Sequence, residues 1–166
     1  VTITSNDGAV TMQAAVTGPG TAVDFTVNAE SIIVTNIDTA GGVLSLTSTS
    51  GDITAAALTS SNTGGGAAAG TITVNAANGL TTGDVSAAGV VAGDNAGAVS
   101  IIAGDNYNLD GSITATATGA AVGAGITLNT GRTTIGTGIT IATTGDNGDG
   151  DISITVLPAP ALIAND

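Results

Sequence analysis

The sequence predicts an all-β fold: a parallel β-helix, or solenoid, with three short strands in each coil. Pairs of apolar residues separated by one small or polar residue recur along the chain, as expected for strands with one buried face. Segments rich in Gly, Ala and Asp separate these pairs, and such residues form corners between strands. No 3.6-residue periodicity is sustained, and the residues that favour helix surfaces are scarce, so helices are not expected.

The recurring apolar pairs mark the first strand of each coil. Their first members are separated by 24, 19, 28, 27, 27 and 26 residues, so the later steps are nearly constant. A unit of this length cannot bury its apolar face alone, which predicts about six to seven stacked coils of 19–28 residues. The pairs are Val1/Ile3, Phe25/Val27, Leu44/Leu46, Ile72/Val74, Val99/Ile101, Ile126/Leu128 and Ile152/Ile154.

Two further apolar anchors in each unit predict the second and third strands. The second anchor follows the first by 8 to 10 residues and the third by 12 to 14 residues. A slim interior filled by Val, Ile, Leu and Ala explains why only 1% of the chain is aromatic. The second anchors are Val10, Ile33, Ile53, Leu80, Leu109 and Ile135; the third anchors are Ala14, Ile37, Leu58, Val85, Ile113 and Ile139.

The 27-residue step also predicts a contact between coils. Asp105 lies six residues after Val99, and Arg132 lies six residues after Ile126. The two side chains are therefore expected to meet at the same turn of adjacent coils. An exposed pair of this kind contributes at most about 1 kcal/mol, and a solvated Arg132 without a fixed partner is the alternative.

Charge and composition exclude several classes of function. One basic residue against 13 acidic ones gives a net charge of -12, so no positive patch can neutralise a nucleic-acid backbone. The chain has no His and no Cys, which removes the usual zinc ligands and the Ser-His and Cys-His nucleophile pairs. The longest apolar run, residues 156–164, is too short to span a bilayer. Glu30 is the only Glu and most Asp residues lie in Gly-flanked corners, so we expect no enzyme activity.

One acidic turn suggests a cation site. The run Gly145–Asp151 places Asp146, Asn147, Asp149 and Asp151 in a single glycine-rich turn. Calcium takes several oxygen ligands, and glycines allow backbone carbonyls to contribute. The spacing matches neither an EF-hand loop nor the nonapeptide repeat of calcium β-rolls. The turn therefore predicts calcium as a candidate ligand, with an ordinary Asx-rich turn as the alternative.

Threonines suggest a second candidate surface. They form Thr-x-Thr pairs at residues 2/4, 47/49, 71/73 and 114/116/118. Regular Thr arrays on a flat solenoid face are typical of ice-binding proteins, although outward Thr residues also follow from β-propensity. The pairs do not occupy one fixed position in every coil, so ice binding is an alternative hypothesis.

The ends of the predicted solenoid suggest self-association. The sequence indicates one β-helix domain, residues 1–156, without an amphipathic capping helix. Uncapped end strands offer unpaired N–H and C=O groups to another chain. Residues 157–166 form a Pro-containing apolar tail that is expected either to dock on the next subunit or to fold over its own last coil. Head-to-tail contacts that do not close into a ring give an open filament.

One stretch resembles a known family. The stretch Gly70–Asp105, GTITVNAANGLTTGDVSAAGVVAGDNAGAVSIIAGD, is similar to the repeats of filamentous-haemagglutinin-type adhesins and autotransporter passengers, and a weaker likeness extends over residues 25–156. The resemblance implies secretion, a right-handed β-helix and an adhesive or structural role at the cell surface. The leading hypothesis is an extracellular filament subunit or part of an adhesive fibre. A monomeric adhesin passenger segment that binds glycans or surfaces is the alternative from a second class.

Overall fold

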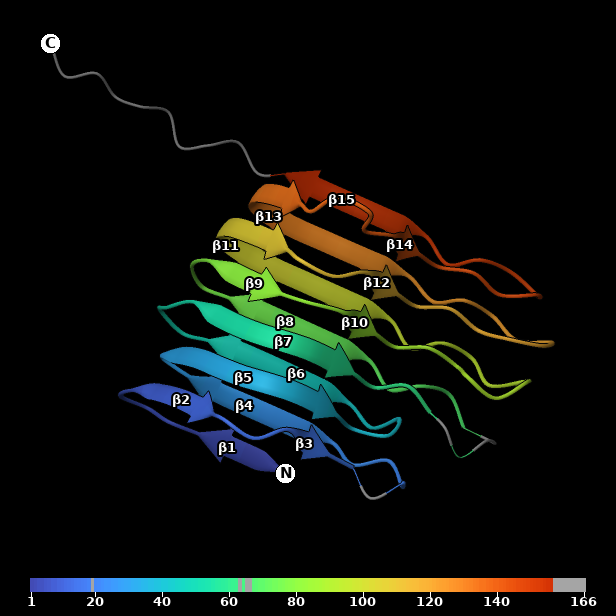
Figure 1. Cartoon of the computed structure of the whole chain (residues 1–166), viewed down its shortest axis with the longest axis horizontal. Coiled ribbons are helices and arrows are strands. Elements are labelled where there is room, and N and C mark those ends of the chain that lie inside the picture. The colour runs from blue at the N-terminus through green and yellow to red at the C-terminus, as the bar shows by residue number, and fades with distance from the viewer. Residues whose placement is uncertain (19, 63, 65–66, 157–166) are drawn as a thin grey trace, which may run out of the picture.

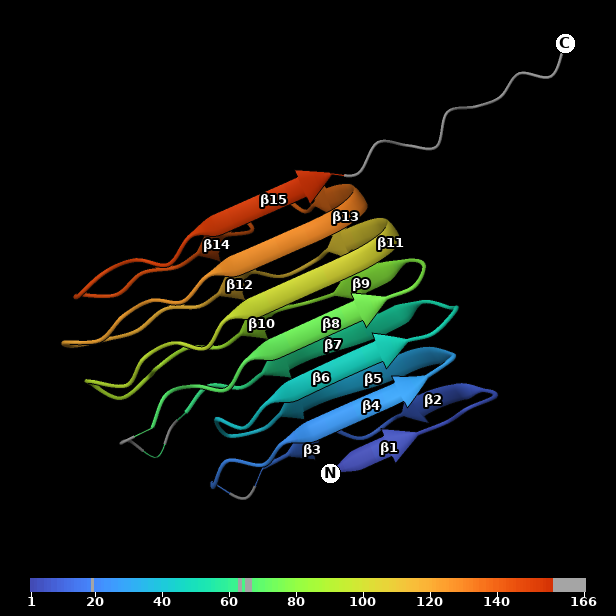
Figure 2. The ribbon, with the colours of Figure 1, turned by 180° about the vertical axis from the view of Figure 1, so that it is seen from behind.

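The chain winds into a β-solenoid of about six turns (Figures 1 and 2). The computed structural model describes residues 1–18, 20–62, 64 and 67–156. In these residues it has fifteen strands and no helix, and every strand pair is parallel. The strands form three columns around one narrow interior, so the predicted parallel β-helix is confirmed.

One strand from each coil forms the front column. Along it, Ile72 is the register partner of Val99, and Val99 is the partner of Ile126, so the apolar residues lie one above the next. The predicted apolar pairs are therefore confirmed as stacked strands. The column contains β1 (Thr2–Thr4), β4 (Phe25–Ala29), β6 (Leu44–Ser48), β8 (Ile72–Ala76), the first halves of β11 (Val99–Leu109) and β13 (Ile126–Ile135), and β15 (Ile152–Val156).

The first wrong anchor in the second column is Ile33. Ile32, not Ile33, is the register partner of Ile53, and Ile33 is exposed. Alternation cannot choose among the consecutive apolar residues 32–34, and the buried pair Ile32 and Val34 fixes the choice. The column contains β2 (Ala9–Met12), the first halves of β5 (Ser31–Asp38) and β7 (Ile53–Thr59), β9 (Leu80–Thr82), and the second halves of β11 and β13.

The predicted anchors of the second column are also wrong in the fifth and sixth coils. Tyr107, not Leu109, is the register partner of Leu80, and Thr133 follows it in the next coil. Leu109 is also buried, but it lies two residues further along, beside Ile135. The predicted positions of Leu109 and Ile135 are therefore wrong by two residues. The sequence pattern took only apolar residues as anchors, whereas Tyr107 and Thr133 occupy these two positions.

The third column begins and ends at residues that the sequence pattern missed. Val16 replaces the predicted Ala14, and Ile141 replaces the predicted Ile139. The four predicted anchors between them, Ile37, Leu58, Val85 and Ile113, form one continuous stack. The column contains β3 (Val16–Thr17), the second halves of β5 and β7, β10 (Val85–Ser86), β12 (Ile113–Thr114) and β14 (Ile141–Ala142).

A single apolar cluster fills the interior of the described coils. It extends from Phe25 to Leu128 and consists mainly of Ile, Leu, Val and Ala. Tyr107 is fully buried in it, and its hydroxyl lies 2.8 Å from the Thr82 hydroxyl, so neither polar group is left unpaired. The predicted tail, residues 157–166, lies outside the described residues, so its docking role stays a prediction.

The glycine-rich returns project from one side of the stack as thin, closely apposed arms (Figures 1 and 2). Within one return, Gly97 donates its N–H to the carbonyl of Ala87, which lies on the opposite side of the same loop, at 2.9 Å. A Cβ on Gly97 would lie 2.0 Å from the carbonyl oxygen of Gly70 in the coil below, and a Cβ on Gly70 would lie 2.0 Å from that of Gly42. Coil stacking at this column therefore requires glycine.

Candidate functional site

The outer face of the front column carries a complete row of hydroxyl side chains. Its members are register partners in all seven strands, directly between the two inward apolar rows. Thr-x-Thr pairs alone do not reveal this row, because three of its seven positions are Ser. The row is Thr2, Thr26, Ser45, Thr73, Ser100, Thr127 and Ser153.

A second outward row on the same face is less regular. It alternates between Thr and Asn in the first four strands and is interrupted by Ile102, which is partly exposed. An unbroken asparagine ladder is thus absent from these strands. The row is Thr4, Asn28, Thr47, Asn75, Ile102, Asn129 and Thr155.

The corner Asp residues connect neighbouring coils. Asp52 Oδ1 accepts hydrogen bonds from the Gly79 N–H at 2.9 Å and the Asn78 side-chain amide at 2.8 Å, both one coil further along. Asp24 and Asp84 accept backbone N–H groups of the next coil at 2.9 and 2.8 Å. Each carboxylate thus satisfies a backbone donor that a turn would otherwise expose to water.

These corner contacts share a sequence signal that composition did not reveal. Each Asp stands immediately before an inward apolar anchor: Asp24 before Phe25, and Asp52 before Ile53. The donor occupies the equivalent place in the following coil, immediately before that coil's anchor. Ser112 serves in the same way, since its hydroxyl accepts the Thr140 N–H at 3.2 Å. A polar residue directly before an anchor therefore predicts an acceptor for the next coil.

The Gly145–Asp151 turn places its acidic residues in separate roles. Asp149 Oδ1 accepts the Gly145 N–H at 3.1 Å and closes the turn, while the Asp151 carbonyl accepts the Ile126 N–H at 2.9 Å. The Asn147 N–H donates to Ala121 in the coil below, and Asp146 is exposed. Among the described residues no three acidic, His or Cys side chains converge on a point that could hold a metal ion. The calcium interpretation of this turn stays a prediction.

Arg132 forms no salt bridge with Asp105. Its Nε donates to Asn106 Oδ1 at 2.7 Å, and Asn106 is its register partner. The predicted pair is wrong because the register of β11 against β13 shifts between Ala103 and Asn106, which moves Asp105 out of line. Asp105 instead accepts a 3.1 Å hydrogen bond from the Asn106 side-chain amide.

A hollow of mixed polarity lies on the outer side of the second column. It has a volume of about 360 Å³ and is lined by the exposed Ile33 and by polar side chains, including Ser31, Asp52 and Asn78. Such groups can hydrogen-bond to sugar hydroxyls. An aromatic platform for a sugar ring is lacking, because the chain's two aromatic residues, Phe25 and Tyr107, are both buried.

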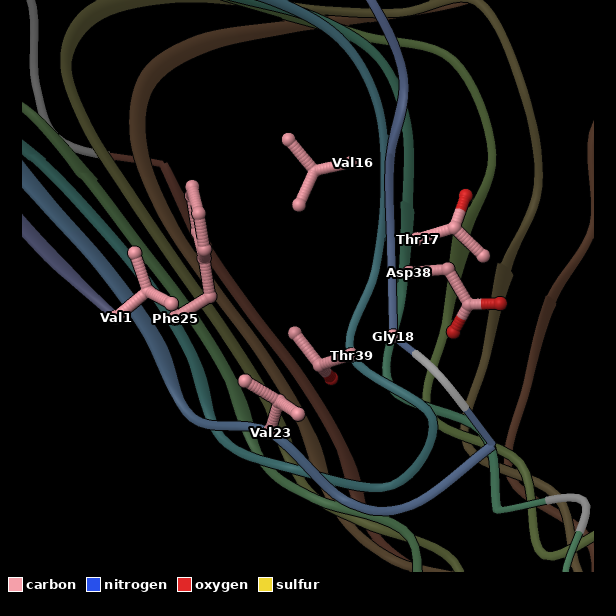
Figure 3. Close-up of a pocket in the computed structure, with 8 residues that line it drawn as sticks. All are labelled: Val1, Val16, Thr17, Gly18, Val23, Phe25, Asp38 and Thr39. Carbon is pink, nitrogen blue, oxygen red and sulfur yellow. The ribbon is translucent and has the colours of Figure 1, made fainter.

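A pocket lies at the β1 end of the described solenoid. A cavity of about 200 Å³ lies between the front and third columns, and Figure 3 shows the Val16, Val23 and Phe25 side chains directed into it. Thr17 and Asp38 point to the outer side of the same wall (Figure 3). Val1 at its rim is 65% exposed, so the apolar interior reaches solvent here.

The strand at the other end is also unprotected in the described part of the chain. β15 pairs with β13 on one side only, and all of its residues are exposed. Ile152, Ile154 and Val156 continue the inward rows of the front column without a coil above them. The described solenoid therefore presents an apolar, unpaired strand edge at each end.

Comparison of the chain with protein-family models, with curated proteins and with solved structures finds no match. The likeness to filamentous-haemagglutinin-type repeats therefore rests on the sequence pattern, and the solenoid fold agrees with it. No helix in the described residues is long and apolar enough to cross a membrane.

Proposed function

We propose that this protein is an extracellular structural element: a β-solenoid rod that polymerises end to end into a filament or forms part of an adhesive surface fibre. The observation that carries the proposal is that β1 and β15, at opposite ends of the described coils, each pair on one side only and have exposed apolar residues beside them. An exposed parallel strand edge is a template for further strands. A solenoid extended at both ends gives a fibre, since the contact does not close.

The use of the polar side chains supports a structural role over a catalytic one. Asp24, Asp52 and Asp84 are each engaged with the backbone of the next coil and hold the rod together. A net charge of -12 opposes lateral clumping of rods, and neither β1 nor β15 carries a charged residue that would oppose contact end to end.

Negative-stain microscopy of the purified chain tests the proposal. Fibres whose length increases with protein concentration are the expected result. Isolated short rods at all concentrations would contradict polymerisation and favour a monomeric passenger segment that binds glycans or surfaces. A chain that lacks residues 157–166 tests the tail: if it folds and still polymerises, the tail takes no part in the contact.

Ice binding is the second candidate, favoured by the complete hydroxyl row of the front column. A flat parallel sheet spaces the row's hydroxyls regularly, at about 4.8 Å from strand to strand. Thermal hysteresis measures this activity directly. Thr73→Lys on the row should abolish it, whereas Thr81→Lys on the second column should not; no hysteresis in the unmodified chain rules the candidate out.

A further inference from the structure

We propose that Asn78 and Gly79 form a latent site of spontaneous deamidation, which the folded solenoid keeps unreactive through the Asp52 carboxylate of the preceding coil. The two residues turn the corner between β8 and β9, in the middle of the described coils. The Asn-Gly sequence occurs twice in the chain, here and at residues 147–148. The inference does not depend on whether the rod polymerises.

An Asn-Gly sequence can modify itself without an enzyme. The backbone nitrogen of Gly79, once it has lost its proton to hydroxide, attacks Cγ of the Asn78 side chain. The bond between this nitrogen and Cγ forms, the bond from Cγ to the amide nitrogen breaks, and the amide nitrogen takes a proton from water and leaves as ammonia. Water then opens the five-membered ring and leaves aspartate or isoaspartate, with no oxidation or reduction. Glycine favours the reaction because it has no Cβ beside the attacking nitrogen and its backbone rotates freely.

Neighbouring coils hold the backbone of this corner on both sides. The Asn78 carbonyl accepts the Asp105 N–H of the following coil at 3.0 Å. The Gly79 carbonyl accepts the Ile53 N–H of the preceding coil at 3.0 Å. Ring closure must turn the peptide group that joins Asn78 to Gly79, and the Asn78 carbonyl belongs to this planar group. The reaction in the folded chain must therefore break a hydrogen bond between coils.

The Asp52 carboxylate binds both reacting groups at once. Its Oδ1 accepts the Gly79 N–H, which contains the attacking nitrogen, at 2.9 Å. The same oxygen accepts the Asn78 side-chain amide, which is the leaving group, at 2.8 Å. The attacking nitrogen reacts as an anion, and its attack places negative charge on the side-chain oxygen of Asn78. A carboxylate in contact with both groups opposes this charge, and its hydrogen bonds stabilise the unreacted state.

The other Asn-Gly pair is held differently. The Gly148 N–H donates to the neutral Gly145 carbonyl at 3.2 Å, whereas the Gly79 N–H donates to a carboxylate. The electrostatic protection is therefore a property of the Asp52 corner and not of every Asn-Gly turn in this chain.

Conversion at this corner should prevent the coil from closing again. A new carboxylate at residue 78 would face the Asp52 carboxylate, and two like charges in contact repel. Isoaspartate also adds a methylene group to the main chain, between two strands whose register depends on the corner. Leu80, which follows directly and is buried in the second column, would be displaced. The reaction thus turns a brief opening of the corner into a permanent defect.

Peptide mapping by mass spectrometry tests the role of Asp52. Every protein compared carries Asn147→Gln, which removes the other Asn-Gly pair, and is incubated in the folded state at mildly alkaline pH. Asp52→Ala should raise the rate of Asn78 conversion about tenfold or more, as expected when a hydrogen bond to a charged group is lost. An unchanged rate in the folded Asp52→Ala protein overturns the inference.

Asp84→Ala is the matched control. Asp84 Oδ1 accepts the Ser112 N–H of the next coil at 2.8 Å, so this variant loses the same kind of contact at a corner without an Asn-Gly pair. The rate at Asn78 should stay unchanged. Equal acceleration by both variants would mean that general loosening of the coils sets the rate, and this result also overturns the role of Asp52.

A glycine substitution tests the attacking atom. Asp52→Ala removes the Oδ1 atom that a Cβ on Gly79 would approach to 3.1 Å, so Gly79→Ala can be added to it. The added methyl group crowds the backbone nitrogen and should slow the conversion of Asn78 again. An unchanged rate in the double variant contradicts attack by this nitrogen.

Circular dichroism first establishes that each variant folds. If Asp52→Ala does not fold, the Asn147→Gln chain is compared with and without denaturing urea. Asn78 should then convert about tenfold or more faster in the unfolded chain, because only there is the corner open throughout. Equal rates in the two states overturn the protection.

Discussion

The middle coils and the end coils contain the same kinds of residue but differ in what surrounds them. Ile101 in the fifth front strand is 0% exposed, whereas Ile154, in the same inward row two coils later, is 49% exposed. The difference arises because, in the described part of the chain, Ile101 has a coil on each side and Ile154 has one. In a solenoid, stability is therefore a property of neighbouring coils, and each end lacks one neighbour.

The largest effect should come from a charge in the middle of an inward row. Val99→Asp buries an unpaired carboxylate at a site that is 1% exposed, which costs several kcal/mol and should abolish folding. Ile152→Asp changes the same row at the end, where the residue is 46% exposed, and should cost less than about 1 kcal/mol. Thermal unfolding followed by circular dichroism measures both, and similar losses would show that the two regions do not differ as described.

A crowded glycine and an uncrowded one should respond differently to substitution by alanine. A Cβ on Gly97 would lie 2.0 Å from the Gly70 carbonyl oxygen, so Gly97→Ala must displace the backbone of a neighbouring coil. We expect a loss of about 1–3 kcal/mol. A Cβ on Gly125 meets nothing closer than 3.5 Å, so Gly125→Ala should be neutral or stabilise by up to about 1 kcal/mol. Urea unfolding of the two variants compares them, and a neutral Gly97→Ala contradicts the close stacking.

The buried tyrosine should make stability depend on alkaline pH. Burial raises the pKa of Tyr107 well above its usual range, an effect only partly opposed by the hydrogen bond with Thr82. The folded chain therefore keeps its phenol protonated where the unfolded chain ionises, near pH 10. The free energy of unfolding should stay constant just below about pH 10 and fall by up to about 1.4 kcal/mol per pH unit above it.

A matched variant isolates this effect, because the chain contains one Tyr and no other phenol. Tyr107→Phe should remove the alkaline slope and cost about 1 kcal/mol at neutral pH, since the Thr82 hydroxyl loses its partner. Absorbance at alkaline pH reports the ionisation directly. A phenol that titrates near pH 10 while the chain is still folded would show that Tyr107 is accessible to water.

The smallest effect should come from the exposed cation near the C-terminal end. Arg132 donates to Asn106 at 2.7 Å, but the contact is exposed to solvent. Arg132→Gln should therefore change the free energy of unfolding by less than about 0.5 kcal/mol. Chemical denaturation checks this value, and a loss above about 1 kcal/mol would mean that this contact contributes to holding the last coils together.

The front column was predictable because its signal is local. Ile72 and Val74 alternate within a single strand, and alternation needs no knowledge of the neighbouring coil. The second column was not predictable in the same way. The shift between Ala103 and Asn106 displaced the expected Arg132 contact, and Tyr107, which carries a polar hydroxyl, occupies the anchor position expected for Leu109.

The two candidate surfaces also combine features that are visible in the sequence with features that depend on the register between coils. The acidic turn at residues 145–151 was visible in the sequence, but the partners of Asp149 and Asp151 depend on how the turn folds. The complete hydroxyl row became apparent only when the strands were placed in register, because Ser45, Ser100 and Ser153 interrupt the Thr pattern along the chain.

The residue pattern alone specifies a stack of short parallel strands around an aliphatic interior, because alternation and glycine-rich corners are properties of neighbouring residues. Only the three-dimensional fold shows which side chain of each corner faces inward. It also decided which carboxylate binds the next coil. These depend on the register between coils, and register is set by contacts between residues some 19 to 29 positions apart.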